Sequence, residues 1–524
     1  MKNRIEKHTP YFLGMAAIYA ICFAVAFYKN YLGLTFPLIT AVTLIVCALY
    51  LKKLGVAWKK SSWLYAGACL LLGVSTVLTT SLFVVFFNTV GILLLITVVM
   101  LRQVYDDREW NFGQYLVNLL FLYLNMIPEV AAPILHFMRY LKAHKKGEEN
   151  QEKNKGIKYV MFGVLIGLPM LIFVVLLLSS ADQLFSKIVG EAFYKLFSQI
   201  LFSPNVILVI LLIILGFFGV YSFLSALSLN NMPENTSSVK KRNPLTAITF
   251  LSMVTFIYVI FCVIQIVFLF TGGMLLPEGY TYAEYAHQGF FQLLFVCIFN
   301  LILVVSCIAV FDRNRILNVL LLLFSGCTYV MIASSAFRMI LYIRTYHLSF
   351  LRVLVLWFLA LLSVLMAGVA LTVLRREFGL FRYCMAVVAA FYLVFSFGKV
   401  DVLVAKYNVA QMGESISYED LKYLTSLSVD VVPVLSQYQF AHENCIRHGG
   451  TYVQTYDYYT PAGIWGYDME TGRSVLKKGC RRCLLNKTFH RVIERTEGMT
   501  LRTFHVSKCL ARETAEMYFE AGKK

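Results

Sequence analysis

Charged residues are scarce in this sequence. They make up 15% of the 524 residues, whereas hydrophobic residues make up 59%, and the mean hydropathy is +0.69. Soluble domains are about 45–50% apolar, so this composition excludes an ordinary soluble protein. It predicts an all-α polytopic transmembrane helix bundle, because only helices and closed barrels satisfy their backbone hydrogen bonds in lipid.

Signatures of catalysis are also lacking. The sequence contains no Gly-rich phosphate loop, no HExxH and no GxSxG. The acidic loop Asp106-Asp107-Arg108-Glu109 has no second carboxylate motif to complete a metal-diphosphate site. We therefore expect no cofactor, and a non-enzymatic protein is favoured over an enzyme.

The positive charge belongs to the membrane part of the chain. Of the 47 basic and 29 acidic residues, 16 and 14 lie after Lys399, which leaves 31 basic and 15 acidic residues in the short loops between apolar segments. Cytoplasmic loops of membrane proteins carry such an excess and face anionic lipid. The lipid bilayer, not nucleic acid, is the partner that the net charge of +18 indicates.

Apolar segments of about 20 residues predict about eleven spans, with the N-terminus inside and the C-terminus outside. A double-length segment, 63–101, reads as a hairpin turning near Thr79-Thr80-Ser81. Segment 111–138 is interrupted by Pro128, Glu129 and Pro133. The loops before and after it are both basic and should both be cytoplasmic, so the segment crosses the membrane an even number of times. We expect no crossing, with the segment lying in the interface. The single spans are 11–27, 32–51, 159–179, 205–227, 245–270, 280–311, 316–336, 353–374 and 381–397.

Composition divides the chain into four parts. Residues 1–110 hold N-terminal transmembrane helices, and 111–158 hold an interfacial segment and a basic cytoplasmic loop. Residues 159–399 form a transmembrane core, in which 182–202 reads as an amphipathic helix on the outer surface. Residues 400–524 form a small, mixed α+β tail, with helical patterns at 419–435 and 503–519 and strand-like alternation at 451–460 and 464–476.

Unusual polar side chains gather at the predicted outer ends of the spans. Glu284, His287, Gln288 and Gln292 lie on one arc of about 140° at the start of the 280–311 helix. Three arginines lie on a face where the positive-inside rule expects few. The whole candidate cluster is Asp182, Tyr282, Glu284, Tyr285, His287, Gln288, Arg338, Tyr342, Arg344, Arg352, Asp401 and Asn408.

Two interpretations of this cluster stay open. In the first, arginines bind an anionic head group or small ligand in a pocket walled by tyrosines, among them Tyr280 and Tyr346. In the second, the charges are interhelical clasps and the tyrosines an interfacial belt. Under either interpretation we expect Arg338 to pair with Asp182 or Glu284.

The tail carries a separate group of cysteines. Cys480-Arg-Arg-Cys483 with Cys445 and Cys509 could hold disulfides if the tail is extracytoplasmic. Zinc, with His448, His490 and His505 in reserve, and free thiols are the alternatives. The other eight cysteines lie in apolar segments and read as small packed residues.

Several motifs follow one another in the order of a known family. They are Ser180-Ala-Asp-Gln-Leu-Phe185, Tyr285 to Leu293, Arg338 to Tyr342 with Leu351-Arg352, Asp401 to Asn408, and Tyr423 to Pro433. From about residue 158 onward the chain resembles a bacterial family of polytopic membrane proteins described as a domain of unknown function, the one numbered forty-one seventy-three, and its relatives. The resemblance implies a place in the bacterial cytoplasmic membrane and no particular activity.

Three functional hypotheses remain. The first is a non-enzymatic sensor or accessory protein that contacts an envelope ligand or a partner membrane protein. The second is a transporter or lipid-handling protein that uses the Arg and Glu cluster. The third is a membrane-embedded transferase, for which Glu284, Asp182 or His287 would have to act as the general base.

Overall fold

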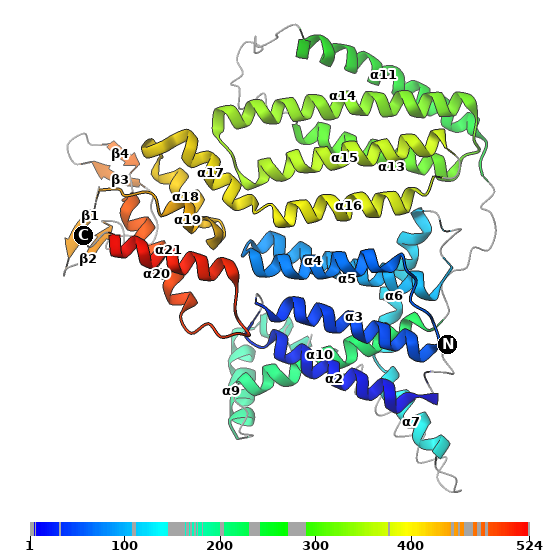
Figure 1. Cartoon of the computed structure of the whole chain (residues 1–524), viewed down its shortest axis with the longest axis horizontal. Coiled ribbons are helices and arrows are strands. Elements are labelled where there is room, and N and C mark those ends of the chain that lie inside the picture. Colours follow the sequence, from blue (N-terminus) through cyan, green and yellow to red (C-terminus); the bar gives the residue numbers. More distant parts are fainter. Residues whose placement is uncertain are drawn as a thin grey trace. The chain divides into compact units, whose positions relative to one another are not determined.

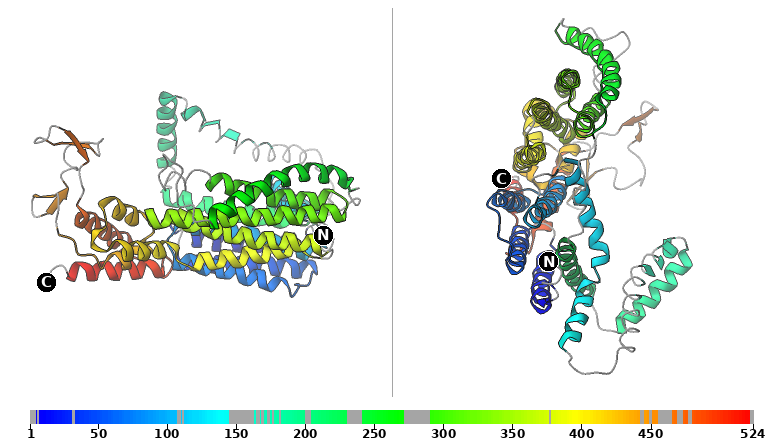
Figure 2. Two further views of the ribbon diagram at one scale, coloured as in Figure 1. Left: turned by 90° about the horizontal axis from the view of Figure 1, so that it is seen from above. Right: turned by 90° about the vertical axis from the view of Figure 1, so that its right-hand side faces the viewer.

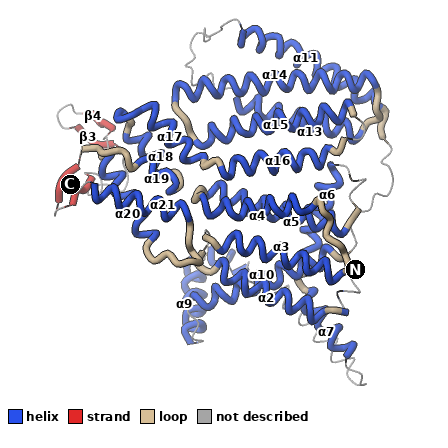
Figure 3. The backbone as a smooth tube through the Cα atoms, in the orientation of Figure 1, coloured by secondary structure: helices blue, strands red, loops and turns tan. Residues whose placement is uncertain are grey.

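The computed structural model is built almost entirely from helices (Figure 3). It describes residues 7–30, 33–106, 112–144, 182–199, 204–229, 241–270, 290–375, 378–441 and 480–521, four short strands between 445 and 476, and isolated positions elsewhere, chiefly within 163–180. The predicted span 159–179 and the residues from Tyr280 to Gly289 thus lie largely or wholly outside the described residues.

The predicted membrane-protein class is confirmed. Nine helices of the described part are long and apolar enough to span a membrane, or ten if one bent pair counts as a span. The expected count of eleven stays a prediction, because α4 (Ser62–Leu78) is a shorter apolar helix and the predicted span 159–179 lies largely outside the described residues. Hydropathy predicted the nine long helices because bilayer thickness fixes the length of a span.

The helices divide between two units. The first comprises Met1–Leu70 and Ile92–Glu234, and the second comprises Leu71–Gly91 and Asn235–Lys524. The hairpin of α4 and α5 (Leu82–Val104) contributes its tip to the second unit and its remainder to the first. The four parts predicted from composition divide the chain differently, and the packing does not test them.

The first unit centres on α10, which packs against α2, α6 and α7. A Cβ on Gly216 of α10 would lie 3.0 Å from the Cβ of Phe23 on α2, so a small residue permits this close crossing. A bend of 54° separates α6 from α7, beside Pro128 and Pro133. Its helices are α2 (Thr9–Phe27), α3 (Thr35–Leu54), α6 (Phe112–Glu129), α7 (Ala132–His144), α9 (Gln183–Gln199) and α10 (Pro204–Leu227).

The second unit contains a row of long apolar helices, with α14 packed against α11, α13 and α15, and α15 against α16 (Figure 1). Asn314 caps α14 by accepting a hydrogen bond from the Ile316 N–H, and Ser349 caps α15 through Arg352 N–H. The helices are α11 (Pro244–Phe270), α13 (Phe290–Val310), α14 (Arg315–Tyr346), α15 (Phe350–Leu374) and α16 (Leu380–Phe397).

Helices α14 and α16 were predicted with different success. The α16 bounds agree with the predicted span 381–397, whereas α14 continues ten residues beyond the predicted end at residue 336. The prediction ended the span where the apolar pattern ended, but the backbone stays helical through Arg338, Tyr342 and Arg344. These side chains therefore belong to a helix and not to a loop.

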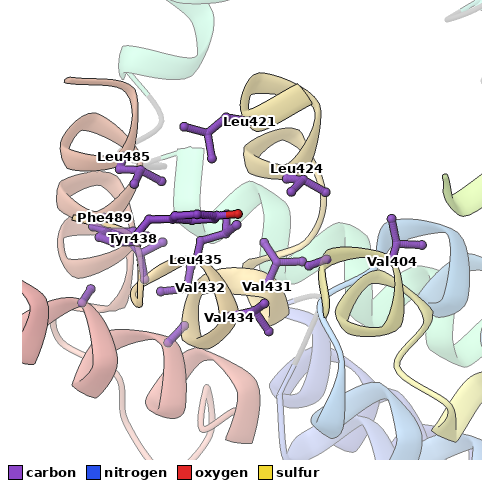
Figure 4. Packing of buried hydrophobic residues seen from close by; sticks show 14 of the residues in the cluster. Val404, Leu421, Leu424, Val431, Val432, Val434, Leu435, Tyr438, Leu485 and Phe489 are labelled. Atoms are coloured by element: carbon purple, nitrogen blue, oxygen red, sulfur yellow. The ribbon is translucent and has the colours of Figure 1, made fainter. Parts of the chain in front are cut away.

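The tail folds against one end of this row, as the left view of Figure 2 shows for the helices that follow α16. Its helices α17, α18, α19, α20 and α21 enclose an apolar core that includes Leu424, Leu435 and Phe489 (Figure 4). These helices are α17 (Val400–Met412), α18 (Tyr418–Ser426), α19 (Val432–Leu435), α20 (Arg481–Thr496) and α21 (Val506–Ala521), with 3-10 turns η1 (Gly413–Ser415) and η2 (Val429–Val431).

The strands of the tail are short and pair two by two. Strand β1 (Cys445–His448) pairs antiparallel with β2 (Thr451–Gln454), and β3 (Trp465–Asp468) with β4 (Arg473–Leu476). The two pairs form separate sheets. Helices therefore build the described core of the tail.

Candidate functional site

Arg338 lies at the outer rim predicted for the bundle. Helix α14 has 32 residues, or about 48 Å, which exceeds the ~30 Å hydrocarbon thickness, and Arg338 is about 35 Å along it from Arg315. Its guanidinium donates to Gln265 Oε1 at 3.3 Å, and the Ser334 hydroxyl donates to the same oxygen at 2.6 Å. Gln265 is about 32 Å along α11 from Pro244, so both helices contribute polar groups at a matching depth.

Of the two carboxylates predicted to pair with Arg338, the structure describes Asp182 and not Glu284. Glu284 lies outside the described residues, as do Tyr282, Tyr285, His287 and Gln288. Asp182 belongs to the first unit, where it accepts hydrogen bonds from the N–H groups of Leu184 at 2.7 Å and Phe185 at 3.4 Å. Asp182 thus caps α9, a role that satisfies a carboxylate at a helix N-terminus. Its pairing with Arg338 stays a prediction.

Arg352 holds the connection between α14 and α15. Its guanidinium donates to the carbonyl oxygens of Tyr346 and His347, and its Cζ lies 4.2 Å from the centre of the Tyr342 ring. His347 adopts a positive φ of 61°, an unusual conformation for a residue other than glycine. Arg352 therefore stabilises a tight connection, whereas Arg344 is exposed at the same end.

Asn408 fastens the tail to that connection. Its side-chain oxygen accepts from the Leu348 N–H at 2.9 Å, and its amide nitrogen donates to the Leu348 carbonyl at 2.8 Å. Two residues further, the Tyr423 hydroxyl of α18 accepts from the Phe350 N–H at 2.9 Å. Three predicted site residues, Tyr342, Arg352 and Asn408, thus meet around one connection.

A group of buried polar contacts lies at the tip of the α4–α5 hairpin. The Asp430 carboxylate accepts hydrogen bonds from the Thr79 hydroxyl at 2.5 Å and from the Thr80 hydroxyl at 3.0 Å and N–H at 3.1 Å. The Thr80 hydroxyl in turn accepts from the Val429 N–H at 3.1 Å. We call Thr79, Thr80, Asp401, Asp430 and His505 the hairpin-tip cluster.

Asp401 joins this cluster and not the arginines. The carboxylate accepts from the Ser428 N–H at 3.3 Å, and the side chain is 5% exposed. Burial raises the pKa of the Asp401 carboxyl; hydrogen bonds from Ser428 and Ser81 oppose the rise, and the nearby Asp430 adds to it. The sequence predicted Asp401 as one wall of a site shared with Asp182 and Arg338, and that larger site stays a prediction.

His505 completes the cluster from α21. Its Nε2 lies 3.3 Å from the Thr79 carbonyl oxygen, so Nε2–H donates to it, and the neighbouring Ser507 hydroxyl donates to the Leu78 carbonyl. Burial lowers the pKa of His505 to about 4, and the positive charge of Lys508 contributes. The imidazole is therefore neutral at pH 7, and Nδ1 contacts no hydrogen-bond donor in the described part of the chain.

The cysteines of the tail are partly described. Cys480 is buried at the N-cap of α20, where its sulfur accepts from the Cys483 N–H at 3.3 Å, and Cys483 and Cys509 are half-buried. The side chain of Cys445 lies outside the described residues. Within the described residues, no three His, Cys, Asp or Glu side chains come together as metal ligands. Disulfide, zinc and thiol states all stay predictions.

The hairpin-tip cluster connects the α4–α5 turn to the tail through hydrogen bonds. The buried Asp430 carboxylate and the neutral His505 imidazole bind hydroxyl and backbone groups of the hairpin turn, and the buried Asp401 carboxylate binds the Ser428 N–H beside Asp430 in the tail. Sequence reasoning noticed Thr79-Thr80-Ser81 as a turn and Asp430 within a motif, but it did not connect them. The available signal was a hydroxyl-rich turn between two apolar helices, which needs a polar partner if it is buried.

Comparison with known proteins gives one relationship. Searches of the curated proteins and of the solved structures find no significant match. The family described as "Domain of unknown function (DUF4153)" matches residues 66–438, well over half of the chain. The resemblance to a membrane family of unknown function is thereby confirmed, while the number forty-one seventy-three is corrected and the match begins earlier than residue 158. The chain belongs to the family DUF4153.

Proposed function

We propose that the protein is a non-enzymatic sensor or accessory protein of the bacterial cytoplasmic membrane, in which an envelope ligand or partner engages the outer rim of the second unit and the tail. The depth of the polar groups of Arg338 and Gln265 carries this proposal. Arg338 and Gln265 lie about 32–35 Å from the opposite ends of their helices, just beyond the hydrocarbon thickness. Groups at this rim can meet a ligand without opening the bundle.

The packing of the tail supports the same function. Val84 and Phe395 of the hairpin and α16 share an apolar core with Val404, Leu424 and Leu435 of the tail. Asp430 and Asn408 add directed hydrogen bonds to this contact. A ligand that moved the tail would therefore move the ends of the transmembrane helices, as a sensor or a regulatory subunit requires.

Orientation and tail fold belong to the same proposal. We place the N-terminus inside and the tail outside, because the basic loops mark the cytoplasmic face. The tail would then be a small mixed α+β extracytoplasmic domain, with β1 to β4 extending from its helical core. Disulfides among Cys445, Cys480, Cys483 and Cys509 would suit that compartment.

A transporter or lipid-handling protein is the alternative, and one network favours it. Asn300 of α13 is buried, accepts from the Tyr258 hydroxyl at 3.0 Å and donates to the Thr328 hydroxyl at 3.0 Å. These residues lie about 15–21 Å from the predicted cytoplasmic ends of α13, α11 and α14, near the middle of the membrane. Buried polar groups at this depth mark substrate paths in many membrane proteins, or join helices.

The transferase hypothesis has less support. It needs a general base, and Asp182 already accepts two backbone hydrogen bonds at the start of α9. The other candidates, Glu284 and His287, lie outside the described residues.

Complementation of a deletion strain separates these functions. The strain is profiled for growth across envelope stresses and complemented with Arg338→Gln, Arg344→Gln or Asn300→Leu at equal membrane levels, with Arg375→Gln as the matched control. A sensor or accessory protein loses complementation in the two rim variants and keeps it in Asn300→Leu and the control. Loss in Asn300→Leu alone would replace the proposal with transport.

The predicted pairing of Arg338 with Glu284 is tested separately. Arg338 and Glu284 are replaced singly and then exchanged. If the exchange restores protein levels and the single changes alter nothing besides expression, the two residues form a structural clasp, and the rim pocket is abandoned.

A further inference from the structure

Apolar side chains are exposed where the tail begins its last helix. Leu501 is 85% exposed, Phe504 39%, Val506 38% and Leu510 47%. On the opposite face of α21, Ala511 and Ala515 are buried. Isolated exposed apolar residues are ordinary, but four within ten residues form a patch that requires a partner.

Local structure projects this patch outward. Helix α20 ends at Thr496, and Gly498 follows with φ of 73°, the conformation that commonly terminates helices. A turn from Thr500 to Thr503, closed by the Thr503 N–H donating to the Thr500 carbonyl at 3.1 Å, places Leu501 at its tip. The turn thus presents a large apolar side chain away from the tail.

Two hydrogen bonds join the segment that carries the patch to the end of α4. His505 and Ser507 bind the carbonyl oxygens of Thr79 and Leu78, where the apolar helix α4 ends. Leu82, the first residue of α5, is 78% exposed at the same turn. Since α4 and α5 are apolar up to this turn, the turn marks the boundary of the hydrocarbon layer, and Leu501, Phe504 and Val506 lie near that boundary.

We propose that the patch formed by Leu501, Phe504, Val506 and Leu510 inserts into the bilayer at the boundary between head groups and acyl chains. The occupant is lipid because His505 and Ser507 tie the patch to the turn at which Leu82, itself 78% exposed, begins the apolar helix α5. An amphipathic segment with one buried face and one apolar exposed face is suited to this interface. The tail is thereby anchored at a second place besides the hairpin-tip cluster.

This anchor is independent of the ligand and activity proposed above. It requires only that the protein spans a membrane, and it holds whichever side the tail occupies. Lipid contact by the patch would restrain the tail near the bilayer surface.

The test uses the full-length protein in lipid nanodiscs. An environment-sensitive fluorescent amino acid replaces Leu501 in one variant and Glu520, an exposed residue near the other end of α21, in the matched control. Nanodiscs are prepared with and without lipids that carry a nitroxide quencher near the head group. We expect quenching at position 501 to exceed that at position 520 by at least about twofold, as interfacial insertion implies.

Aqueous iodide provides the reverse measurement. We expect iodide to quench position 520 more than position 501. Equal lipid quenching at both positions, or protection of position 501 from both quenchers, would overturn the proposal; the second outcome would indicate a protein partner. Because the Leu501 side chain is 85% exposed, its replacement removes little packing, and the elution volume of each variant checks the fold.

Discussion

The Asp430 carboxylate of the tail lies 2.5 Å from the Thr79 hydroxyl at the tip of the α4–α5 hairpin. The same carboxylate accepts from the hydroxyl and the N–H of Thr80, so one side chain satisfies three donors of a buried turn. Hydrogen bonds to charged groups are stronger than neutral ones, and donors that lose a buried acceptor bear the whole desolvation cost. Asp430 should therefore be a main determinant of tail docking.

Replacement of Asp430 by alanine should lower the free energy of unfolding by about 2–4 kcal/mol, since three donors at the turn lose their acceptor. Thermal unfolding of the detergent-solubilised protein, followed by loss of the monodisperse elution peak, measures the change. Glu513→Ala, at an exposed position of α21, is the control and should unfold at nearly the wild-type temperature. Equal melting temperatures for the two variants would contradict a structural role for Asp430.

Acid should weaken the same contact through His505. Its pKa is about 4 in the folded protein against 6.5 ordinarily, so between these values the unfolded chain binds more protons than the folded one. Stability is then present above pH 6.5 and is lost as the pH falls towards 4, by at most about 3 kcal/mol. Asp401 acts in the opposite sense because burial raises its pKa, so its protonation favours the folded state.

The variant His505→Gln tests this dependence. Glutamine can still donate to the Thr79 carbonyl but does not titrate, so the loss of stability between pH 6.5 and 4 should become smaller. Asp401→Asn should make the loss steeper, because it removes the opposing group. Melting temperatures over this pH range are the measurement, and an unchanged pH profile in His505→Gln would assign the sensitivity to groups other than His505.

The spans could be predicted from the sequence because their cause is local. An apolar run of about 20 residues is required by bilayer thickness whatever its neighbours are, and α2, α10, α15 and α16 agree with the predicted ranges. The end of α14 was misplaced because hydropathy reports the membrane boundary and not the end of the helix. Arg338 and Arg344 continue the helix into the polar region, where arginine is a good helix former.

The contacts of the candidate site could not be predicted, because their causes are not local. Asp401 was grouped with Asp182 and Arg338 because all three follow or end spans on one predicted face, and nothing in the local sequence indicated its contacts with Ser428 and Asp430. Thr79 and Asp430 are 351 residues apart, and no periodicity links them. Helix α20 was not predicted because Cys480-Arg-Arg-Cys483 was considered only for disulfide, zinc or free-thiol chemistry, whereas Cys480 caps the helix.

A close crossing of α15 and α16 provides a stability test within the bundle. A Cβ added to Gly368 would lie 2.1 Å from Cε1 of Tyr383, whose hydroxyl donates to the Val364 carbonyl at 2.8 Å. The ring must move, so Gly368→Ala should destabilise the protein by about 1–3 kcal/mol, the usual cost of overpacking. Gly326 of α14 has open space at the same position, so Gly326→Ala should be neutral or slightly stabilising.

These two variants form a matched pair, since both add one methyl group to an apolar helix. The melting temperature of Gly368→Ala should fall, and that of Gly326→Ala should stay or rise. A further variant, Gly368→Ala with Tyr383→Leu, should recover part of the loss because it removes the clashing ring. Equal effects of the two single substitutions would show that α15 and α16 do not approach as closely as Gly368 and Tyr383 indicate.

Orientation can be measured with an impermeant thiol reagent in intact cells. If the tail is outside, Glu520→Cys should be labelled above the wild-type background without permeabilisation, and Lys60→Cys, in a loop predicted to be cytoplasmic, only after it; both positions are exposed. The native cysteines report redox state in the same experiment, because Cys509 is half-buried and disulfides would release label sites upon reduction. Labelling of Lys60→Cys in intact cells, with protection of Glu520→Cys, would show that the topology is the reverse of the one predicted. That result would also move Arg338, Arg344 and the hairpin-tip cluster to the cytoplasmic side, where an envelope ligand could not reach them.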